Sequence, residues 1–99
     1  MTIRDLAMQD GRVYVRLATL ELRQKFMEQA EAEGFTFSDG VKPIKRDADV
    51  IMAVNRDLTI NYVGMFGRMA YGSETRTTCG KPLIRVEYAE IAAQMEMLV

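Results

Sequence analysis

The chain has 99 residues, of which 13 are Lys or Arg, 14 are Asp or Glu and 48% are hydrophobic, a composition typical of one globular domain over residues 1–99. Because it has no histidine and a single cysteine, a Ser-His-Asp triad, a Cys-His nucleophile pair and histidine-bound zinc or haem are excluded, so we expect no enzymatic activity and no cofactor. The formal net charge of −1 disfavours a wholly basic nucleic-acid-binding surface.

Residues 1–11 precede the first regular pattern of the chain. Ile3, Leu6 and Ala7 have the spacing of a helix, and Gly11 ends the segment. We interpret these residues as an N-terminal arm.

A change of hydrophobic period predicts a strand followed by a helix. Alternating apolar residues predict the strand over 12–18, and Gly11 marks its start. Thr19 as N-cap and Gly34 as C-terminal stop then bracket a helix over 20–33. The stripe of this helix that we expect to face the core consists of Leu20, Leu22, Phe26, Met27 and Ala30.

The middle of the chain is rich in strand signals. Phe35 and Phe37 predict a short strand that ends at the turn signal 38–40. Residues 49–54 and 59–64 are β-rich runs separated by Asn55-Arg56-Asp57-Leu58, which predicts a hairpin. In the following residues up to Gly72, Met65 and Met69 have helical spacing but three glycines interrupt them, so a short helix and an irregular strand extension are both open.

The C-terminal part predicts a strand that leads into a helix. Ile84, Val86 and Tyr88 alternate with polar residues, and the helix after them carries apolar residues on one face. The resulting order β-α-β-β-β-β-α predicts an α+β fold, with a mainly antiparallel sheet of four to five strands and helices packed on one face. The predicted core includes Leu22, Phe26, Ile60, Val86 and Ile91.

Residues 64–85 hold the main basic cluster, in which four cations are opposed by Glu74 alone. Loops held by a rigid sheet concentrate binding residues, and an aromatic ring beside cations can anchor an interface. We therefore predict a binding surface here, with the contacts Arg68, Tyr71, Arg76, Lys81 and Arg85. The alternative interpretation is that these residues form a mixed charged surface, which solubility alone requires.

An acidic pole is the alternative binding surface. It consists of Glu28, Glu31, Glu33 and Asp39, and it can imitate a phosphate backbone in the groove of a nuclease. Sequence order does not decide between the acidic helix and the basic loop.

Two short patterns suggest chemistry and are better explained structurally. Asp47 and Asp49 lie on one side of an extended chain, as magnesium ligands can. The pattern lacks a third acidic ligand, so we interpret the two aspartates as solvated turn residues and predict no metal.

Gly64-Met65-Phe66-Gly67 fits the G-x-x-G pattern of an RNA-binding module. The strand before it and the apolar pair inside it favour tight backbone packing instead.

The longest uninterrupted apolar run is Val50–Val54, which is far shorter than a membrane span or a signal-peptide core. The lone thiol of Cys79 fits a reducing compartment. We therefore expect a cytoplasmic protein with no membrane contact.

Four segments carry a resemblance to known sequences: Val13–Leu17, Ala30–Phe37, Thr59–Gly64 and Met69–Gly72. The string from Val13 to Tyr88, about three quarters of the chain, resembles short uncharacterised proteins of prophages and conjugative elements of gut Firmicutes. No catalytic motif accompanies that group. The resemblance implies a small non-enzymatic interaction protein of a mobile genetic element, and in its most specific form an anti-CRISPR-like counter-defence inhibitor that binds a host nuclease.

Two other functions fit the sequence less well. The runner-up is a nucleic-acid-binding accessory or regulatory protein that uses the basic segment from Arg68 to Arg85, and the third is a metal-dependent enzyme around Asp47 and Asp49. The partner that we expect is a host protein, with nucleic acid as the weaker candidate, and the chain is expected to be a monomer or a homodimer.

Overall fold

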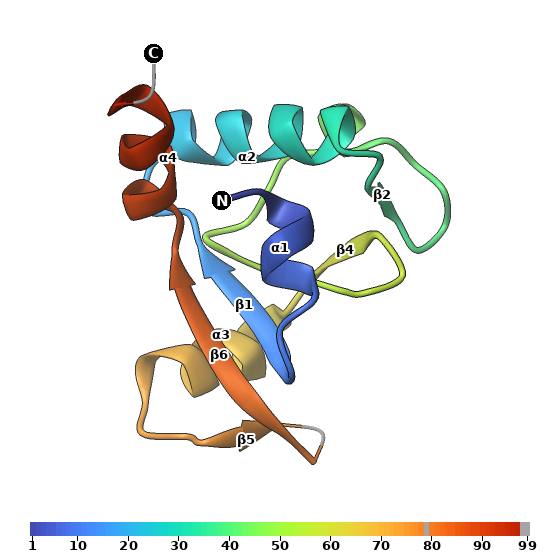
Figure 1. The fold of residues 1–99 in the computed structure, drawn as a ribbon. Helices are drawn as coiled ribbons and strands as arrows, with labels where there is room; N and C mark the ends of the chain where they lie inside the picture. The colour runs from blue at the N-terminus through green and yellow to red at the C-terminus, as the bar shows by residue number, and fades with distance from the viewer. Residues whose placement is uncertain (79, 98–99) are drawn as a thin grey trace.

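The computed structural model describes residues 1–78 and 80–97, with side chains up to Gln94, so Cys79 lies outside the described residues. Figure 1 shows the elements, which confirm the predicted α+β class. In chain order they are α1 (Ile3–Ala7), β1 (Arg12–Arg16), α2 (Leu20–Ala32), β2 (Thr36–Phe37), the 3-10 turn η1 (Pro43–Lys45), β3 (Ile51–Val54), β4 (Thr59–Tyr62), α3 (Gly64–Gly72), β5 (Thr77–Thr78), β6 (Lys81–Glu87) and α4 (Tyr88–Met97).

The sheet is mixed and has six strands in the order β2-β4-β3-β1-β6-β5. Its central strand β1 is antiparallel to β3 and parallel to β6, and β2 is parallel to β4. The expectation of four to five mainly antiparallel strands is therefore wrong in strand number and incomplete in direction. Strand β5 has only two residues, too few for an alternation to be visible, and parallel partners far apart in the chain leave no local signal.

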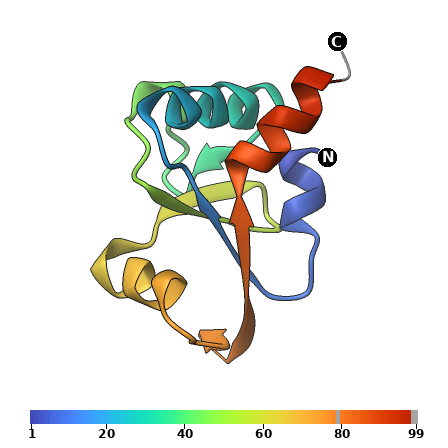
Figure 2. The ribbon, with the colours of Figure 1, turned by 90° about the vertical axis from the view of Figure 1, so that its left-hand side faces the viewer.

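Helices cover both faces of the sheet, so the expectation of helices on one face is wrong. Val13 and Val15 of β1 point into the larger core, which α1, α2 and α4 cover. Tyr14, between them, points to the opposite face, where Ala70 and Tyr71 of α3 pack against it and its neighbours. Figures 1 and 2 show α3 and β5 at the end of the molecule opposite α2.

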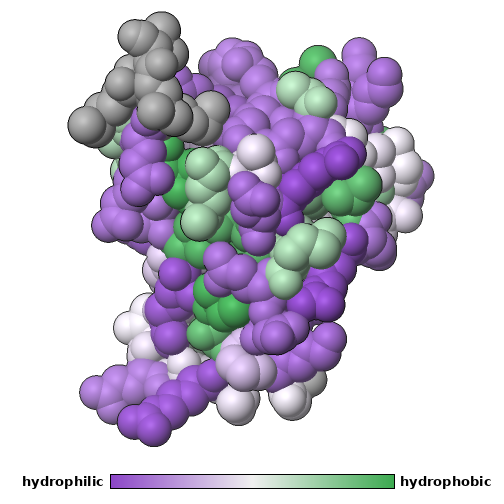
Figure 3. All heavy atoms as spheres, viewed as in Figure 1, coloured by the Kyte–Doolittle hydropathy of each residue, from purple (hydrophilic) through white to green (hydrophobic). Residues whose placement is uncertain are grey.

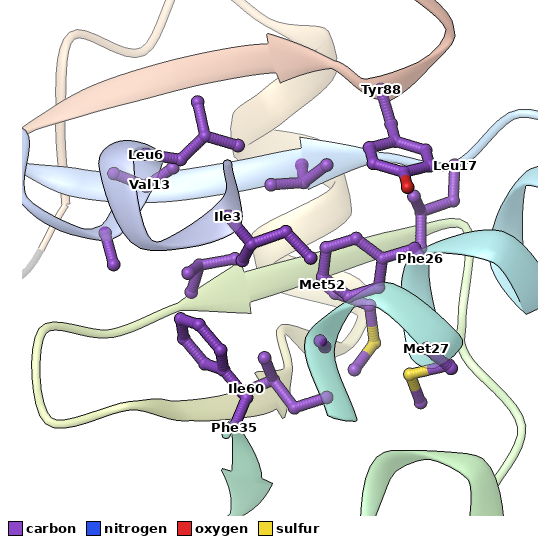
Figure 4. Packing of buried hydrophobic residues seen from close by; sticks show 14 of the residues in the cluster. Ile3, Leu6, Val13, Leu17, Phe26, Met27, Phe35, Met52, Ile60 and Tyr88 are labelled. Carbon is purple, nitrogen blue, oxygen red and sulfur yellow. The ribbon is translucent and has the colours of Figure 1, made fainter. Parts of the chain in front are cut away.

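The larger core holds most of the predicted core residues, and Figure 4 shows its packing. Phe26, Ile60 and Ile91 are buried, and Leu22 and Val86 pack against them partly buried. The rings of Phe26 and Tyr88 pack nearly perpendicular to each other, with centroids 5.5 Å apart. Leu20 was expected in this core and is 77% exposed, because it lies about 120° around the helix from Phe26.

The N-terminal segment packs on the core instead of extending from it as an arm. Its helical spacing is confirmed by α1, where Ile3 and Leu6 are buried in the larger core. Thr2 caps the helix, and the carboxylate of Glu33 accepts hydrogen bonds from the backbone N–H groups of Ile3 and Arg4 at 3.0 and 2.9 Å. Residues 1–11 are therefore tied to the end of α2.

Candidate interaction surface

The segment that the sequence left open between helix and strand forms helix α3. Gly64 begins it with a φ of +70°, a left-handed conformation that glycine adopts without steric cost. Gly67 is buried, and a side chain there would collide with Val63. Tight backbone packing, the favoured interpretation of the G-x-x-G pattern, is therefore confirmed at Gly67.

The side of α3 that faces away from the sheet is apolar and exposed. Met65, Phe66 and Met69 are 60%, 80% and 62% exposed, and we call these three residues the α3 outer face. Side chains of this size leave on the order of 400 Å² of apolar surface, which is the size of functional patches on monomeric proteins. The helical spacing of Met65 and Met69 did not predict this face, because methionine also serves as core filler.

Arg85, predicted as a binding residue, holds the end of α3 in place. Its guanidinium donates hydrogen bonds to the carbonyl oxygens of Ala70, Tyr71, Ser73 and Thr75 at 2.7–2.9 Å. Carbonyl groups at the end of a helix have no partner within the helix, and a cation there is favourable. Arg85 thus fixes α3 and the loop after it on β6.

Two more of the predicted contacts have partners inside the molecule. The Tyr71 hydroxyl donates to the carbonyl oxygen of Val86 at 3.1 Å, and burial of the half-buried ring raises the pKa of Tyr71. Arg68 forms an ion pair with Asp49 at 2.7 Å. Both side chains attach α3 to the sheet, which leaves them less free to bind a partner.

Arg76 and Lys81 remain as free cations of the predicted set. Both are exposed on the β5–β6 hairpin, and among the described residues neither has an ion-pair partner. Figure 3 shows that this lower end of the molecule is covered mainly by hydrophilic and neutral residues. Of the four predicted cations, two are therefore available for a partner, and both lie on the β5–β6 hairpin.

The alternative acidic pole is largely occupied by contacts within the chain. Glu33 binds the first turn of α1, and Asp39 forms an ion pair with Arg46 at 2.6 Å that holds the pKa of Asp39 below its usual range. Glu28 accepts a hydrogen bond from Gln24. The side chains of Glu33 and Asp39 are therefore engaged within the chain, whereas Glu28 lies exposed on α2.

Asp47 and Asp49, the two aspartates considered as metal ligands, have different surroundings in the structure. One oxygen of Asp49 accepts the N–H of Val50 at 2.7 Å and the other binds Arg68, whereas Asp47 lines a groove beside α2. Within residues 1–78 and 80–97, no group of three or more acidic or cysteine side chains could hold a metal ion. This pair therefore has no third acidic ligand among those residues.

The groove beside α2 has a volume of about 490 Å³ and was not predicted from the sequence. One wall consists of α2 residues at helical spacing, and the other consists of Ile44 and residues 46–48. The spacing of Leu20, Arg23 and Met27 could have indicated a second helical stripe, but nothing in the sequence places a loop opposite it.

No family model, curated protein or solved structure matches the chain. In the part of the chain that the structure describes, no helix is long and apolar enough to cross a membrane.

Proposed function

We propose that the chain is a small interaction protein without enzymatic activity that acts in the cytoplasm by covering a surface of a larger host protein. Because the chain resembles proteins of mobile genetic elements, we infer that the larger host protein is a CRISPR nuclease. The chain would then be a counter-defence inhibitor of this nuclease. The contact surface is the α3 outer face together with Arg76 and Lys81.

The observation that carries this proposal is the exposure of the α3 outer face. Large apolar side chains that project together into water mark binding sites, and methionine adapts well to the shape of a partner. Arg85 and the Arg68–Asp49 pair hold α3 in position, so little conformational entropy is lost on binding. Arg76 and Lys81 favour a partner with acidic groups around an apolar groove.

Nucleic-acid binding is less well supported as the function. Of the four cations in the basic segment, Arg68 and Arg85 have partners within the chain, which leaves two for phosphate groups. With two phosphate contacts, affinity depends only weakly on salt: the logarithm of the binding constant falls with the logarithm of the salt concentration with a slope of about −2. An exposed Phe66 between two methionines also adds no charge complementarity to a phosphate backbone.

The proposal is tested by titrating the chain into a purified RNA-guided CRISPR nuclease from a Firmicutes host. We expect DNA cleavage to fall in proportion to added chain and to stop at equimolar ratio, because binding alone explains the effect. Phe66→Ser should abolish inhibition, and Leu20→Ser, which changes an equally exposed side chain on α2, should leave it unchanged.

Two results would contradict the proposal. One is unchanged cleavage at excess chain. The other is substoichiometric consumption of nucleic acid with magnesium that Asp47→Asn combined with Asp49→Asn abolishes, which would favour the metal-dependent enzyme.

A further inference from the structure

The groove beside α2 is separate from the α3 outer face and has the size of a small-molecule site. Its volume of about 490 Å³ lies within the range of typical ligand pockets. Leu20 of α2 and Ile44 of η1 form apolar lips that are 77% and 53% exposed, and the nearly buried Met27 contributes to the lining between them. An aliphatic group can therefore leave water in this groove.

The wall opposite α2 is held in place by contacts with Asp39, Phe37 and Tyr62. Arg46 is paired with Asp39, and its guanidinium lies 4.7 Å from the centre of the Phe37 ring. The Tyr62 hydroxyl donates to the carbonyl oxygen of Asp47 at 2.6 Å. These contacts fix residues 44–48 without a ligand, so the groove is preformed.

Arg23 provides a positive charge in the lining without a counter-ion. Its Nε donates to the carbonyl oxygen of Leu17 at 3.0 Å, which orients the guanidinium of this partly buried residue. Among the described residues, its two terminal amino groups have no hydrogen-bond partner and the side chain has no ion pair. Two parallel N–H groups at the end of a guanidinium match the two oxygens of a carboxylate.

The other charges of the groove restrict which anion fits. Glu28 and Asp47 line the same groove, and Arg46 is already neutralised by Asp39. A ligand with several negative charges, such as an oligophosphate, would be repelled by these two carboxylates. A single carboxylate placed at Arg23 adds one negative charge, which the adjacent guanidinium neutralises, whereas each further charge of an oligophosphate would face Glu28 and Asp47 without a free cation of the lining to balance it.

We propose that this groove binds an aliphatic monocarboxylate, with the carboxylate on Arg23 and the hydrocarbon chain against Leu20, Met27 and Ile44. The ligand is either a free fatty acid or the C-terminal residue of a polypeptide, since both combine one carboxylate with an aliphatic chain. This site is independent of the proposed α3 contact, and its test involves no nuclease.

The test is a titration of the 15N-labelled chain with octanoate, in which binding is monitored through the backbone amide chemical shifts of the protein. We expect saturable shifts in residues 20–28 and 44–48, and none with acetate or 1-octanol at the same concentrations. N-acetyl-leucyl-leucine with a free carboxylate, compared with its amide, distinguishes the source. If the dipeptide with the free carboxylate saturates the shifts at a lower concentration than octanoate, the natural ligand is the C-terminus of a polypeptide. If octanoate saturates at the lower concentration, the natural ligand is a fatty acid.

Arg23→Gln should weaken binding of octanoate at least about tenfold, the effect of losing a charge-assisted hydrogen bond. Lys45→Gln is the matched control, because it removes the same charge next to the groove from a side chain that does not line it. Leu20→Asn changes an exposed lip that the fold does not need and should weaken binding as well. Equal affinities of the Arg23 and Lys45 variants, or equal binding of octanoate and 1-octanol, would overturn the proposal.

Discussion

Arg85 illustrates how a residue that looks functional in a sequence can serve the fold. An arginine in a basic, glycine-rich segment is typical of a binding surface, yet the guanidinium of Arg85 donates to four carbonyl oxygens. These carbonyl groups belong to the end of α3 and the loop after it, where the repeating hydrogen bonds of the helix end. The position of Arg85 on β6 therefore determines how α3 is presented to solvent.

Replacing Arg85 with methionine should lower the free energy of unfolding by about 1–3 kcal/mol, because charged hydrogen bonds to these carbonyl groups are lost. Arg76→Met is the matched control, since Arg76 is exposed without an ion pair among the described residues, and should change stability by less than about 0.5 kcal/mol. Urea denaturation measures both. Equal losses in the two variants would show that Arg85 does not hold α3.

Tyr88 makes stability depend on pH in the alkaline range. Its hydroxyl donates to Gln29 at 2.6 Å, and burial, with a smaller effect of the Glu33 charge, raises its pKa to about 12. The folded chain thus holds the phenolic proton more tightly than the unfolded chain, whose tyrosines have pKa values near 10. This contribution is fully present below pH 10 and is lost between about pH 10 and 12.

We expect the wild-type chain to lose up to about 2–3 kcal/mol more stability than Tyr88→Phe as the pH rises through this range. At neutral pH the variant should be less stable by about 1 kcal/mol, because the hydrogen bond to Gln29 is absent. Denaturation at a series of pH values measures both effects. Parallel pH profiles for the two proteins would rule out Tyr88 as the titrating group.

At the scale of elements, two faces of α2 have different surroundings. Phe26 and Ala30 face the larger core, whereas Leu20 and Arg23 line the groove. Leu20 was expected to widen the core stripe of Leu22, Phe26 and Ala30, but it lies at the margin of the apolar arc, about 120° from Phe26, where it faces the groove instead. A helix at the surface of a small sheet can therefore be amphipathic in more than one direction.

Truncating Phe26 to alanine should cost about 3–5 kcal/mol, because the ring is fully buried against Tyr88. Leu20→Ala on the same helix should cost less than about 0.5 kcal/mol, since that side chain is exposed. Thermal and urea unfolding provide the comparison. A cost below about 1 kcal/mol for Phe26→Ala would place the ring outside the core and contradict the assigned face of α2.

At the scale of the whole molecule, the sequence predicted what local periodicity controls. It predicted the core strands, the α2 helix and the hairpin of β3 and β4, because alternation and turn residues act over a few positions. It did not predict the parallel pairing of β1 with β6, or α3 on the second face, because both depend on contacts between distant segments.

The candidate site divides in the same way. Segment 64–85 was predicted as the binding surface from its loops and cations, and this remains a prediction. The partners of Arg68, Tyr71 and Arg85 within the chain could not be predicted. These partners are carbonyl and carboxylate groups, and only the fold brings them close to the three side chains. The exposed Phe66 had no sequence signal, because an apolar residue between glycines suggests packing.

The central claim is that the chain binds its partner through α3 and the adjacent β5–β6 hairpin. Its most direct test is charge reversal on either side of the molecule, with affinity for the nuclease measured by calorimetry at two salt concentrations. Arg76→Glu with Lys81→Glu should weaken binding at least about tenfold and reduce its salt sensitivity, while Glu28→Lys with Glu31→Lys should change the Kd less than about twofold. The opposite pattern would contradict the account and place the contact on α2.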